Sequence, residues 1–444
     1  MPSQDPRRIV IVGAAGRDFH NFNVVYRDDP SAHVVAFTAA QIPGIAGRRY
    51  PPSLAGARYP EGIAIEHEAA LAAICHREQV NEVVFAYSDV PHEQVMHLAS
   101  RALACGADFT LLGPDTTMLH AGVPVIAVSA TRTGVGKSQT ARWITRRLRD
   151  RGLRVVVIRH PMPYGDLERQ RLQRFASMAD LDTAQCTIEE REEFEPHVAA
   201  GTVVYAGVDY AAILEQAERE ADVIVWDGGN NDFPFIRPDL HIVLTDALRP
   251  GDADRFHPGE ATLRMADVVV IAKTNAASSE QIAEAEDEAH RLNPRARVVR
   301  ASSLVTLDAV DSLRGHPVLV VDDGPTLTHG GMPYGAGYVA AVEAGTVPVD
   351  PLPYADATIR DALAPYPHIR FTLPALGYST DQLVALERSI AAVAVDTVIS
   401  GTPIDLAALV HVPQRIVRAR YEFADSGDPS LGAAIDAAIA RLIA

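Results

Sequence analysis

Cysteines and long apolar runs are scarce in this sequence. Only three cysteines occur among 444 residues, at Cys75, Cys105 and Cys186, and no two of them form a C-x-x-C pair. This argues against a disulfide framework and predicts buried thiols in a reducing compartment. No stretch reaches the roughly 18 apolar residues of a membrane span, and no signal-peptide core precedes the first strand pattern. We therefore expect a cytoplasmic protein.

Positive charge is also in the minority. The chain has 40 lysines and arginines against 57 aspartates and glutamates, which gives a net charge of −17. Such a balance argues against general binding to nucleic acid and to an anionic membrane surface, so no partner of either kind is expected. A small anionic ligand would have to be held by a local basic pocket.

Apolar runs of strand length alternate with helix-patterned segments along most of the chain, which predicts an α/β fold with parallel sheets. The strand patterns "RIVIVG", "HVVAFTAA" and "EVVFAYSD" occur in the first part, and the cycle restarts at Val123 with "PVIAVSA". At about one domain per roughly 150 residues, two or three domains are expected. The sequence predicts a Rossmann-like, doubly wound domain at 1–122, a P-loop nucleotide-binding domain with a parallel sheet at 123–335, and a C-terminal α/β extension at 336–444.

The segment "TRTGVGKSQ" lies between a strand pattern and a helix pattern. In a phosphate loop, backbone N–H groups and a helix N-terminus bind phosphate, a lysine reaches the terminal phosphates, and a hydroxyl holds Mg²⁺. Lys137 and Ser138 supply the last two groups, although Thr131 stands where such loops usually open with glycine. A glycine turn between strand and helix is the alternative. The predicted nucleotide-binding residues of the loop are Thr131, Arg132, Thr133, Gly134, Val135, Gly136, Lys137, Ser138 and Gln139.

Arg132 aligns with a lysine that some phosphate loops use. Loops of the form K-G-G-x-G-K-[ST] reach nucleotide phosphate with their first lysine, often across a dimer, and we expect a homodimer here. An arginine in that position would clamp the transferred phosphate. A solvated surface arginine is the alternative.

Asp227 follows the apolar run "DVIVW" at a predicted strand end. A parallel sheet places at such an end the acid that holds Mg²⁺ beside the phosphate loop. We expect Asp227, Lys137 and Arg132 to be catalytic, with Asn230 and Asn231 near the substrate. The alternative is an aspartate that caps the next turn.

The segment "RHPMPYGD" leaves another strand pattern at the same expected sheet edge. Arg159 and His160 are candidates for holding an anionic substrate. Asp166 is a candidate second carboxylate ligand of the metal, in addition to Asp227 and the Ser138 hydroxyl. Each of them is equally well explained by a structural salt bridge.

Lys273 and Asn275 lie in "IAKTN", which partly matches the guanine-reading motif N-K-x-D. Only the lysine is in register, and the guanine-reading carboxylate is replaced by Asn275. We therefore expect both residues at the nucleotide and favour ATP over GTP.

Two further segments carry weaker signals. "VIVGAAGRDFHN" is not the G-x-G-x-x-G of dinucleotide folds, so a nicotinamide cofactor is poorly supported. "DGPTLTHGG" places Thr328 and His329 among glycines, which suits contact with an anion. A glycine-rich connection between domains is the alternative for that segment.

Several long motifs together resemble one family. They include "VIVGAAGRDFHNFNVVYRDDP", "TRTGVGKSQTAR", "RHPMPYGDL", "DGGNNDFPF" and "DGPTLTHGGMPYGAGYVAA". The sequence is similar to proteins described as cyclic 2,3-diphosphoglycerate synthetases or as predicted GTPases. The resemblance to the synthetases implies Mg²⁺-dependent, ATP-driven closure of an intramolecular phosphoanhydride in 2,3-diphosphoglycerate, with release of ADP and phosphate.

The leading hypothesis is thus an ATP- and Mg²⁺-dependent ligase or kinase that acts on a small phosphorylated or carboxylated acid. Activation by phosphoryl transfer is largely positioning and charge neutralisation, for which Lys137, Mg²⁺ and nearby arginines suffice. The alternative is a regulatory P-loop NTPase, a switch or chaperone that controls a protein partner.

Overall fold

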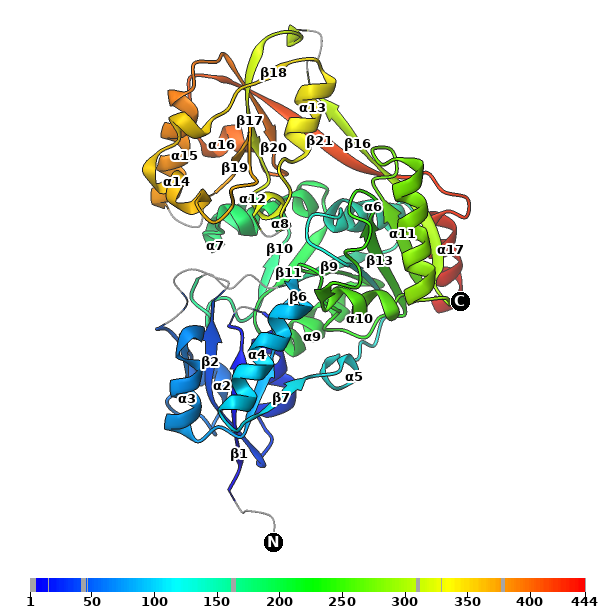
Figure 1. The fold of residues 1–444 in the computed structure, drawn as a ribbon. Coiled ribbons are helices and arrows are strands. Elements are labelled where there is room, and N and C mark those ends of the chain that lie inside the picture. Colours follow the sequence, from blue (N-terminus) through cyan, green and yellow to red (C-terminus); the bar gives the residue numbers. More distant parts are fainter. Residues whose placement is uncertain are drawn as a thin grey trace.

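The protein consists of three stacked parts built around two large sheets (Figure 1). The computed structural model describes residues 5–14, 16–40, 45, 47–160, 165–308, 312–328, 330–376 and 380–443. The expected α/β architecture with large parallel sheets is confirmed. Among the described segments, no helix combines the length and apolar character needed to cross a bilayer.

The N-terminal part contains a six-stranded sheet in the order β3-β4-β2-β1-β5-β7. All neighbours in it are parallel except β3 and β4. Its strands are β1 (Arg7–Val12), β2 (Ala32–Ala39), β3 (Arg49–Tyr50), β4 (Ile63–His67), β5 (Glu82–Phe85) and β7 (Asp108–Leu111). Its helices are α1 (Arg17–Asn21), the π-helix η1 (Phe22–Tyr26), α2 (Pro52–Ala55), the 3₁₀ helix η2 (Glu68–Ala70), α3 (Leu71–Glu78), α4 (His92–Ala104) and α5 (Pro114–Thr117).

The second sheet has thirteen strands and begins in the middle part with the order β10-β11-β9-β12-β8-β13-β15-β16. Its strands there are β8 (Val125–Ala130), β9 (Val155–Arg159), β10 (Gln173–Phe175), β11 (Val203–Ala206), β12 (Val223–Asp227), β13 (Leu240–Asp246), β15 (Val268–Ala272) and β16 (Arg297–Leu307). The helices of this part are α6 (Lys137–Arg149), α7 (Met178–Ala184), α8 (Ile188–Ala199), α9 (Tyr210–Glu220), α10 (Gly259–Arg264) and α11 (Ser279–Leu292). A small ribbon of β6 (Val90–Pro91) and β14 (Phe256–His257) joins this part to the N-terminal part.

The sheet continues into the C-terminal part because β16 pairs antiparallel with β21, which is followed by β20, β17 and β18. The strands are β17 (Pro317–Asp322), β18 (Val347–Pro348), β19 (Leu373–Pro374), β20 (Thr397–Gly401) and β21 (Arg415–Asp425). The helices are α12 (Gly324–Leu327), α13 (Ala336–Glu343), the 3₁₀ helix η4 (Leu352–Tyr354), α14 (Ala357–Leu363), α15 (Thr380–Ala392), α16 (Leu406–Leu409) and α17 (Leu431–Leu442).

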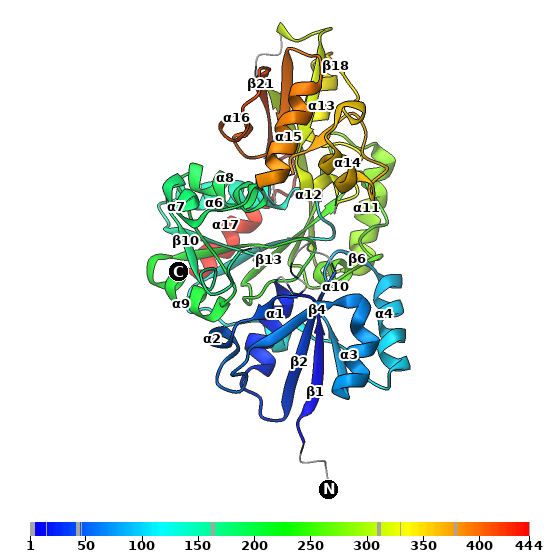
Figure 2. The ribbon, with the colours of Figure 1, turned by 90° about the vertical axis from the view of Figure 1, so that its left-hand side faces the viewer.

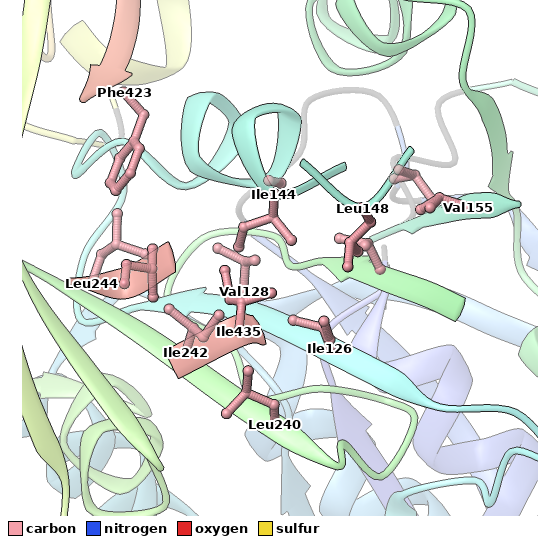
Figure 3. Packing of buried hydrophobic residues seen from close by; sticks show 14 of the residues in the cluster. Ile126, Val128, Ile144, Leu148, Val155, Leu240, Ile242, Leu244, Phe423 and Ile435 are labelled. Carbon is pink, nitrogen blue, oxygen red and sulfur yellow. The ribbon is translucent and has the colours of Figure 1, made fainter. Parts of the chain in front are cut away.

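The central strands of the large sheet form a hydrophobic core beneath α6. β8, β12 and β13 are buried along their whole length and are rich in β-branched residues, which suits a parallel strand covered on both faces. Figure 3 shows Ile144 and Leu148 of α6 packed over Ile126 and Val128 of β8. Ile435 of α17 enters the same core, so the end of the chain returns to the middle part.

The domain boundaries at 122 and 335 stay predictions. β17 precedes residue 335 and already pairs with β18, β19 and β20. The segment after 335 also includes α17, which packs in the middle part.

Candidate functional site

A cavity of about 390 Å³ lies where the three parts meet. That volume falls within the range of small-molecule sites. The N-terminal part contributes Arg17, Asp18, Tyr87 and Ser88 to its wall. The C-terminal side contributes Asp323, Thr326, Tyr334 and Tyr421, and the segment from β8 to α6 lies between the two sides.

The predicted phosphate loop forms the connection between β8 and α6. Gly134 and Gly136 have φ angles of 78° and 120°, which side chains rarely adopt. A side chain at Gly136 would be strained by this φ, and its Cβ would lie 2.6 Å from Gln139 Nε2, the mobile end of that side chain. The cavity wall includes Thr133, Gly134, Gly136, Lys137, Ser138 and Gln139. Thr131, Arg132 and Val135 lie behind it, buried.

Two cationic side chains hold carbonyl groups of this loop in place. Lys273 Nζ donates to the Gly134 carbonyl at 2.8 Å and to Asp246 Oδ2 at 2.7 Å. Arg249 donates to the Thr133 carbonyl at 2.9 Å and also pairs with Asp246. In a trans peptide the N–H points opposite to the carbonyl. The N–H groups of the next residues therefore point away from these cations, as a phosphate-binding nest requires.

Sequence reasoning missed Asp246 and Arg249, and it placed Lys273 at the nucleotide, which stays a prediction. Lys273 lines the cavity, but its ammonium group holds the loop. The available signal was Asp246 at the end of the strand pattern "LHIVLTD". Asn275 also lines the cavity and exchanges two hydrogen bonds with the Ser303 backbone, at 2.9 and 3.1 Å. Recognition of a base by Asn275 stays a prediction.

The chain contains only two lysines, Lys137 and Lys273, beside 38 arginines, and both lysines line this cavity. Lys137 is 7% exposed. Its pKa is lowered to about 8, mainly by burial and also by nearby Arg159, while Asp227 and Glu193 oppose the shift. An ammonium group so poorly solvated gains strongly from an arriving phosphate.

Asp227 lies at the end of β12, fully buried, behind the cavity wall. Its carboxylate pairs with Arg159 at 3.1 Å and with His197 Nε2 at 3.1 Å. Burial alone would raise the pKa of Asp227, but Arg159, His197 and Lys137 outweigh burial and the net shift is downward. The aspartate is thus ionised, and its negative charge balances Arg159 and Lys137.

Arg159 lines the cavity, but its guanidinium is heavily engaged. Besides Asp227, it donates to the Asp227 and Gly228 carbonyls and to Glu193. These contacts agree with the structural salt bridge that was the alternative explanation for Arg159. Substrate binding by Arg159 stays a prediction. His160 also lines the cavity, 3.5 Å from Asp232.

Asp166, the expected second metal ligand, does not reach the wall. It is exposed and accepts the Glu168 N–H at 2.9 Å, so it stabilises a local turn. Other carboxylates do reach the wall, among them Glu193 of α8 and Asp323 before α12. Burial raises the pKa of Asp323 to about 6, and nearby Glu193 adds to the shift, while the Thr326 hydroxyl opposes it. In sequence, the only sign of Asp323 was its place after the strand pattern "PVLVV".

The other predicted substrate residues separate into two groups. Asn230 lines the cavity and donates to Ser88 Oγ at 3.1 Å. Asn231 is fully buried behind the loop, where it donates to the Thr131 carbonyl at 3.0 Å. Thr328 donates to the Gly324 carbonyl at 2.9 Å, and Thr326 is the threonine of this segment that lines the cavity. His329 lies outside the described residues.

Arg132 is bound within the protein on several sides. Its guanidinium pairs with Asp89 at 2.7 Å and Asp252 at 2.6 Å, and it stacks on Phe256 at 3.4 Å. Asp89 also accepts the Thr133 N–H at 2.9 Å. These contacts anchor the loop to the N-terminal part, and they give the predicted phosphate clamp no geometric support.

Comparison with known proteins decides the family. Arginine synthetase ArcE from Thermococcus kodakarensis is 53% identical over 432 residues, which cover 97% of this chain and 96% of that protein. The chain belongs to the arginine synthetase ArcE family. No family model matches the sequence.

Other similarities are remote. Cyclic 2,3-diphosphoglycerate synthetase from Pyrococcus furiosus is 22% identical over 213 residues, covering 44% of this chain and 48% of that protein. The family resemblance inferred from the motifs is therefore real but distant. A DUF1611 family protein from Anabaena variabilis covers 66% of this chain and 94% of that structure, with 12% identity and a TM-score of 0.23. The match to UDP-N-acetylmuramate:L-alanyl-γ-D-glutamyl-meso-diaminopimelate ligase from Neisseria meningitides covers 66% of this chain and 78% of that structure, with 13% identity and a TM-score of 0.28. Scores this low support no inference about this chain.

Both relatives are synthetases by name, so ligase-type activity is the functional class of the family. The acid substrate and product expected from the sequence do not follow from this class.

Proposed function

We propose that this protein is an ATP- and Mg²⁺-dependent synthetase that forms the guanidino group of arginine. The observation that carries the proposal is 53% identity, over 97% of the chain, to a protein named arginine synthetase. The glycine bends before α6 and the buried Lys137 support ATP as the energy source. The proposal includes a Rossmann-like N-terminal fold and a P-loop NTPase fold in the middle part.

The structure of arginine limits the choice of the second substrate. Citrulline differs from arginine by a ureido oxygen in place of one guanidino nitrogen, and that oxygen is a poor leaving group. In the proposed reaction the ureido oxygen attacks the γ-phosphorus and the bond to ADP breaks. Ammonia then adds to the ureido carbon, and the carbon–oxygen bond breaks with release of phosphate. Ammonia is the simplest nitrogen donor for this step, because it leaves the terminal nitrogens of arginine without a substituent and no further bond has to be cleaved.

The cavity offers suitable groups for both halves of this reaction. Lys137 and the loop N–H groups would neutralise and orient the phosphates, which is the main requirement of phosphoryl transfer. Glu193 and Asp323 bring carboxylates to the same cavity wall. Negative charge there suits a guanidinium product, whose planar fork binds carboxylates well.

The wall also suits a magnesium ion that arrives with the nucleotide. Mg²⁺ prefers oxygen ligands and usually takes one or two carboxylates plus substrate phosphates. The Ser138 hydroxyl and the Glu193 and Asp323 carboxylates are such oxygens at the wall. When bound, Mg²⁺ would neutralise phosphate charge. The fully buried Asp227 would act through Lys137 and Arg159, which it keeps charged.

Closure of a phosphoanhydride in 2,3-diphosphoglycerate, which the sequence motifs suggested, has weaker support. Identity to that synthetase is 22% over less than half of the chain. A regulatory NTPase is the other alternative, and it would hydrolyse nucleotide with no small acceptor present.

Measurement of ADP and arginine tests the proposal. Purified protein is given ATP, Mg²⁺, citrulline and ammonium, and each component is omitted in turn. We expect equal amounts of ADP and arginine, and neither product when citrulline or ammonium is missing. The Lys137→Ala variant should be inactive. ADP release without any acceptor would favour the NTPase, and release only with 2,3-diphosphoglycerate would favour the phosphoanhydride reaction.

A further inference from the structure

A second cavity, of about 440 Å³, lies between α6, α8 and β21. α6 and α8 lie side by side above the large sheet (Figure 2). The second cavity is separate from the nucleotide cavity, but Gln139 and Tyr421 line both of them. A ligand here would therefore sit against the first turn of the helix that begins with Lys137.

Five arginines and only two glutamates line this second cavity, which we call the arginine cavity. Arg142, Arg146 and Arg149 are spaced to lie on one face of α6. Arg418 and Arg420 alternate along β21 and so point to one face of that strand. Like charges at such spacings repel one another. The cluster is unusual in a chain whose net charge is −17.

The charges of these arginines are largely uncompensated. Within the described part of the chain, the guanidinium groups of Arg142 and Arg146 make no hydrogen bond or ion pair. Arg149 donates to the neutral Ala200 carbonyl and Thr202 hydroxyl, and Arg418 donates to the Pro403 carbonyl. Arg420 pairs with Asp308 at 3.3 Å, and both side chains are more than half exposed.

The two glutamates of the cavity leave most of this charge uncancelled. Glu195 already pairs with Arg191, at 3.2 Å, and the exposed Glu422 adds one negative charge against five positive ones. His197 also lines the cavity, is 1% exposed, and has no hydrogen-bond partner for Nδ1 among the described residues. Its Nε2 contacts Asp227, so one buried side chain spans from the arginine cavity to the carboxylate behind the phosphate loop.

We infer that the arginine cavity is a second anion site, which binds a phosphate-type oxyanion apart from the phosphate loop. Arginine forks bind phosphate oxygens in pairs, and charge-assisted bonds in a partly enclosed site are the strong ones. A cationic recess in an acidic protein also raises the local concentration of anions. The phosphate has two possible sources: the inorganic phosphate released in the neighbouring cavity, or the phosphate group of a separate metabolite.

Titration calorimetry with inorganic phosphate tests the site without any assumption about the reaction. The Lys137→Ala variant removes binding at the loop and serves as the background. On that background we expect one remaining phosphate site, whose affinity falls more than tenfold when Arg142→Gln and Arg146→Gln are added. Arg388→Gln is the matched control, because it removes an exposed charge on α15 outside both cavities. It should leave the affinity unchanged.

Two results would overturn the inference. One is no phosphate binding by the Lys137→Ala protein, and the other is equal affinity in the variants with and without the two glutamines. Melting temperatures within a degree or two of the background show that the variants are folded. Glycerol 3-phosphate distinguishes the sources. Tighter binding than inorganic phosphate indicates a phosphorylated metabolite, and weaker binding indicates the released phosphate.

Discussion

Lys137 is buried, and its pKa of about 8 makes the charge of the phosphate loop sensitive to pH. An ordinary lysine stays protonated to about pH 10.4. Above pH 8 the Lys137 amine of the free protein is therefore mostly neutral. Binding of ATP then requires that this amine takes up a proton. We expect the affinity for ATP to fall above pH 8, by up to about tenfold per pH unit for one coupled proton. Calorimetry at pH 7 to 9.5 measures this.

The Lys137→Arg variant is the control for this prediction, because arginine stays charged throughout that range. Its ATP affinity should not depend on pH between 8 and 9.5. The same pKa has a consequence for stability. Between pH 8 and the ordinary lysine pKa the unfolded chain binds more protons at this group than the folded chain, so its contribution to stability rises with pH. A flat ATP profile for the parent protein would contradict the prediction.

Gly136 gives a second prediction at the scale of one residue. Alanine there would have to keep a φ of 120°, which side chains rarely adopt, and would displace the Gln139 side chain, so the loop is strained. We expect Gly136→Ala to weaken ATP binding more than tenfold. Gly152→Ala is the matched control, since Gly152 has a φ of 82° after the same helix and an added Cβ meets nothing within 4 Å. It should lower the melting temperature and leave ATP affinity unchanged.

The phosphate loop as an element depends on contacts from other strands. Arg249 donates hydrogen bonds to the Thr133 carbonyl, to the Asp246 carboxylate and to the Gly330 carbonyl. We expect Arg249→Ala to raise the Michaelis constant for ATP about tenfold, because loss of hydrogen bonds to a charged group costs about 1.5–3 kcal/mol. Amide exchange should speed up in residues 131–137 only. Arg264→Ala, which removes an exposed side chain of α10, should change neither quantity. Unchanged exchange in the Arg249 variant would show that the loop holds its shape alone.

The elements that sequence predicts best are those with a local signal. The strands that flank the loop, the glycine bends and the start of α6 follow from periodicity and from one motif. Asp246, Arg249 and Asp323 were missed because they act at the loop or cavity from the ends of β13 and β17, more than a hundred residues away along the chain. Single strand-end polar residues are common, so only the folded sheet distinguishes the functional ones. Asp166 is the opposite case. Its residue type and its segment suited a metal ligand, but its carboxylate caps a local turn.

At the scale of the whole molecule, the sequence could not reveal how the parts join. The antiparallel pairing of β16 with β21 links residues 301–307 with 419–425, and α17 returns to the core under α6. Such contacts between distant segments leave no periodic trace in the sequence. They nevertheless build both cavities, because β21 carries Tyr421 into each of them.

The N-terminal part is held to the middle part by a buried ion pair between Arg17 and Asp232, at 2.6 Å and with side chains 7% and 1% exposed. Arg17 also stacks on Phe233 and Phe235. Removal of one partner leaves a buried charge, which costs about 3–5 kcal/mol. We expect Arg17→Met to lower the urea midpoint of the first unfolding transition clearly. The double variant Arg17→Met with Asp232→Leu should recover much of that loss, because no unpaired charge remains. If the double variant is less stable than Arg17→Met alone, the packing of these side chains, and not their charge, holds the parts together.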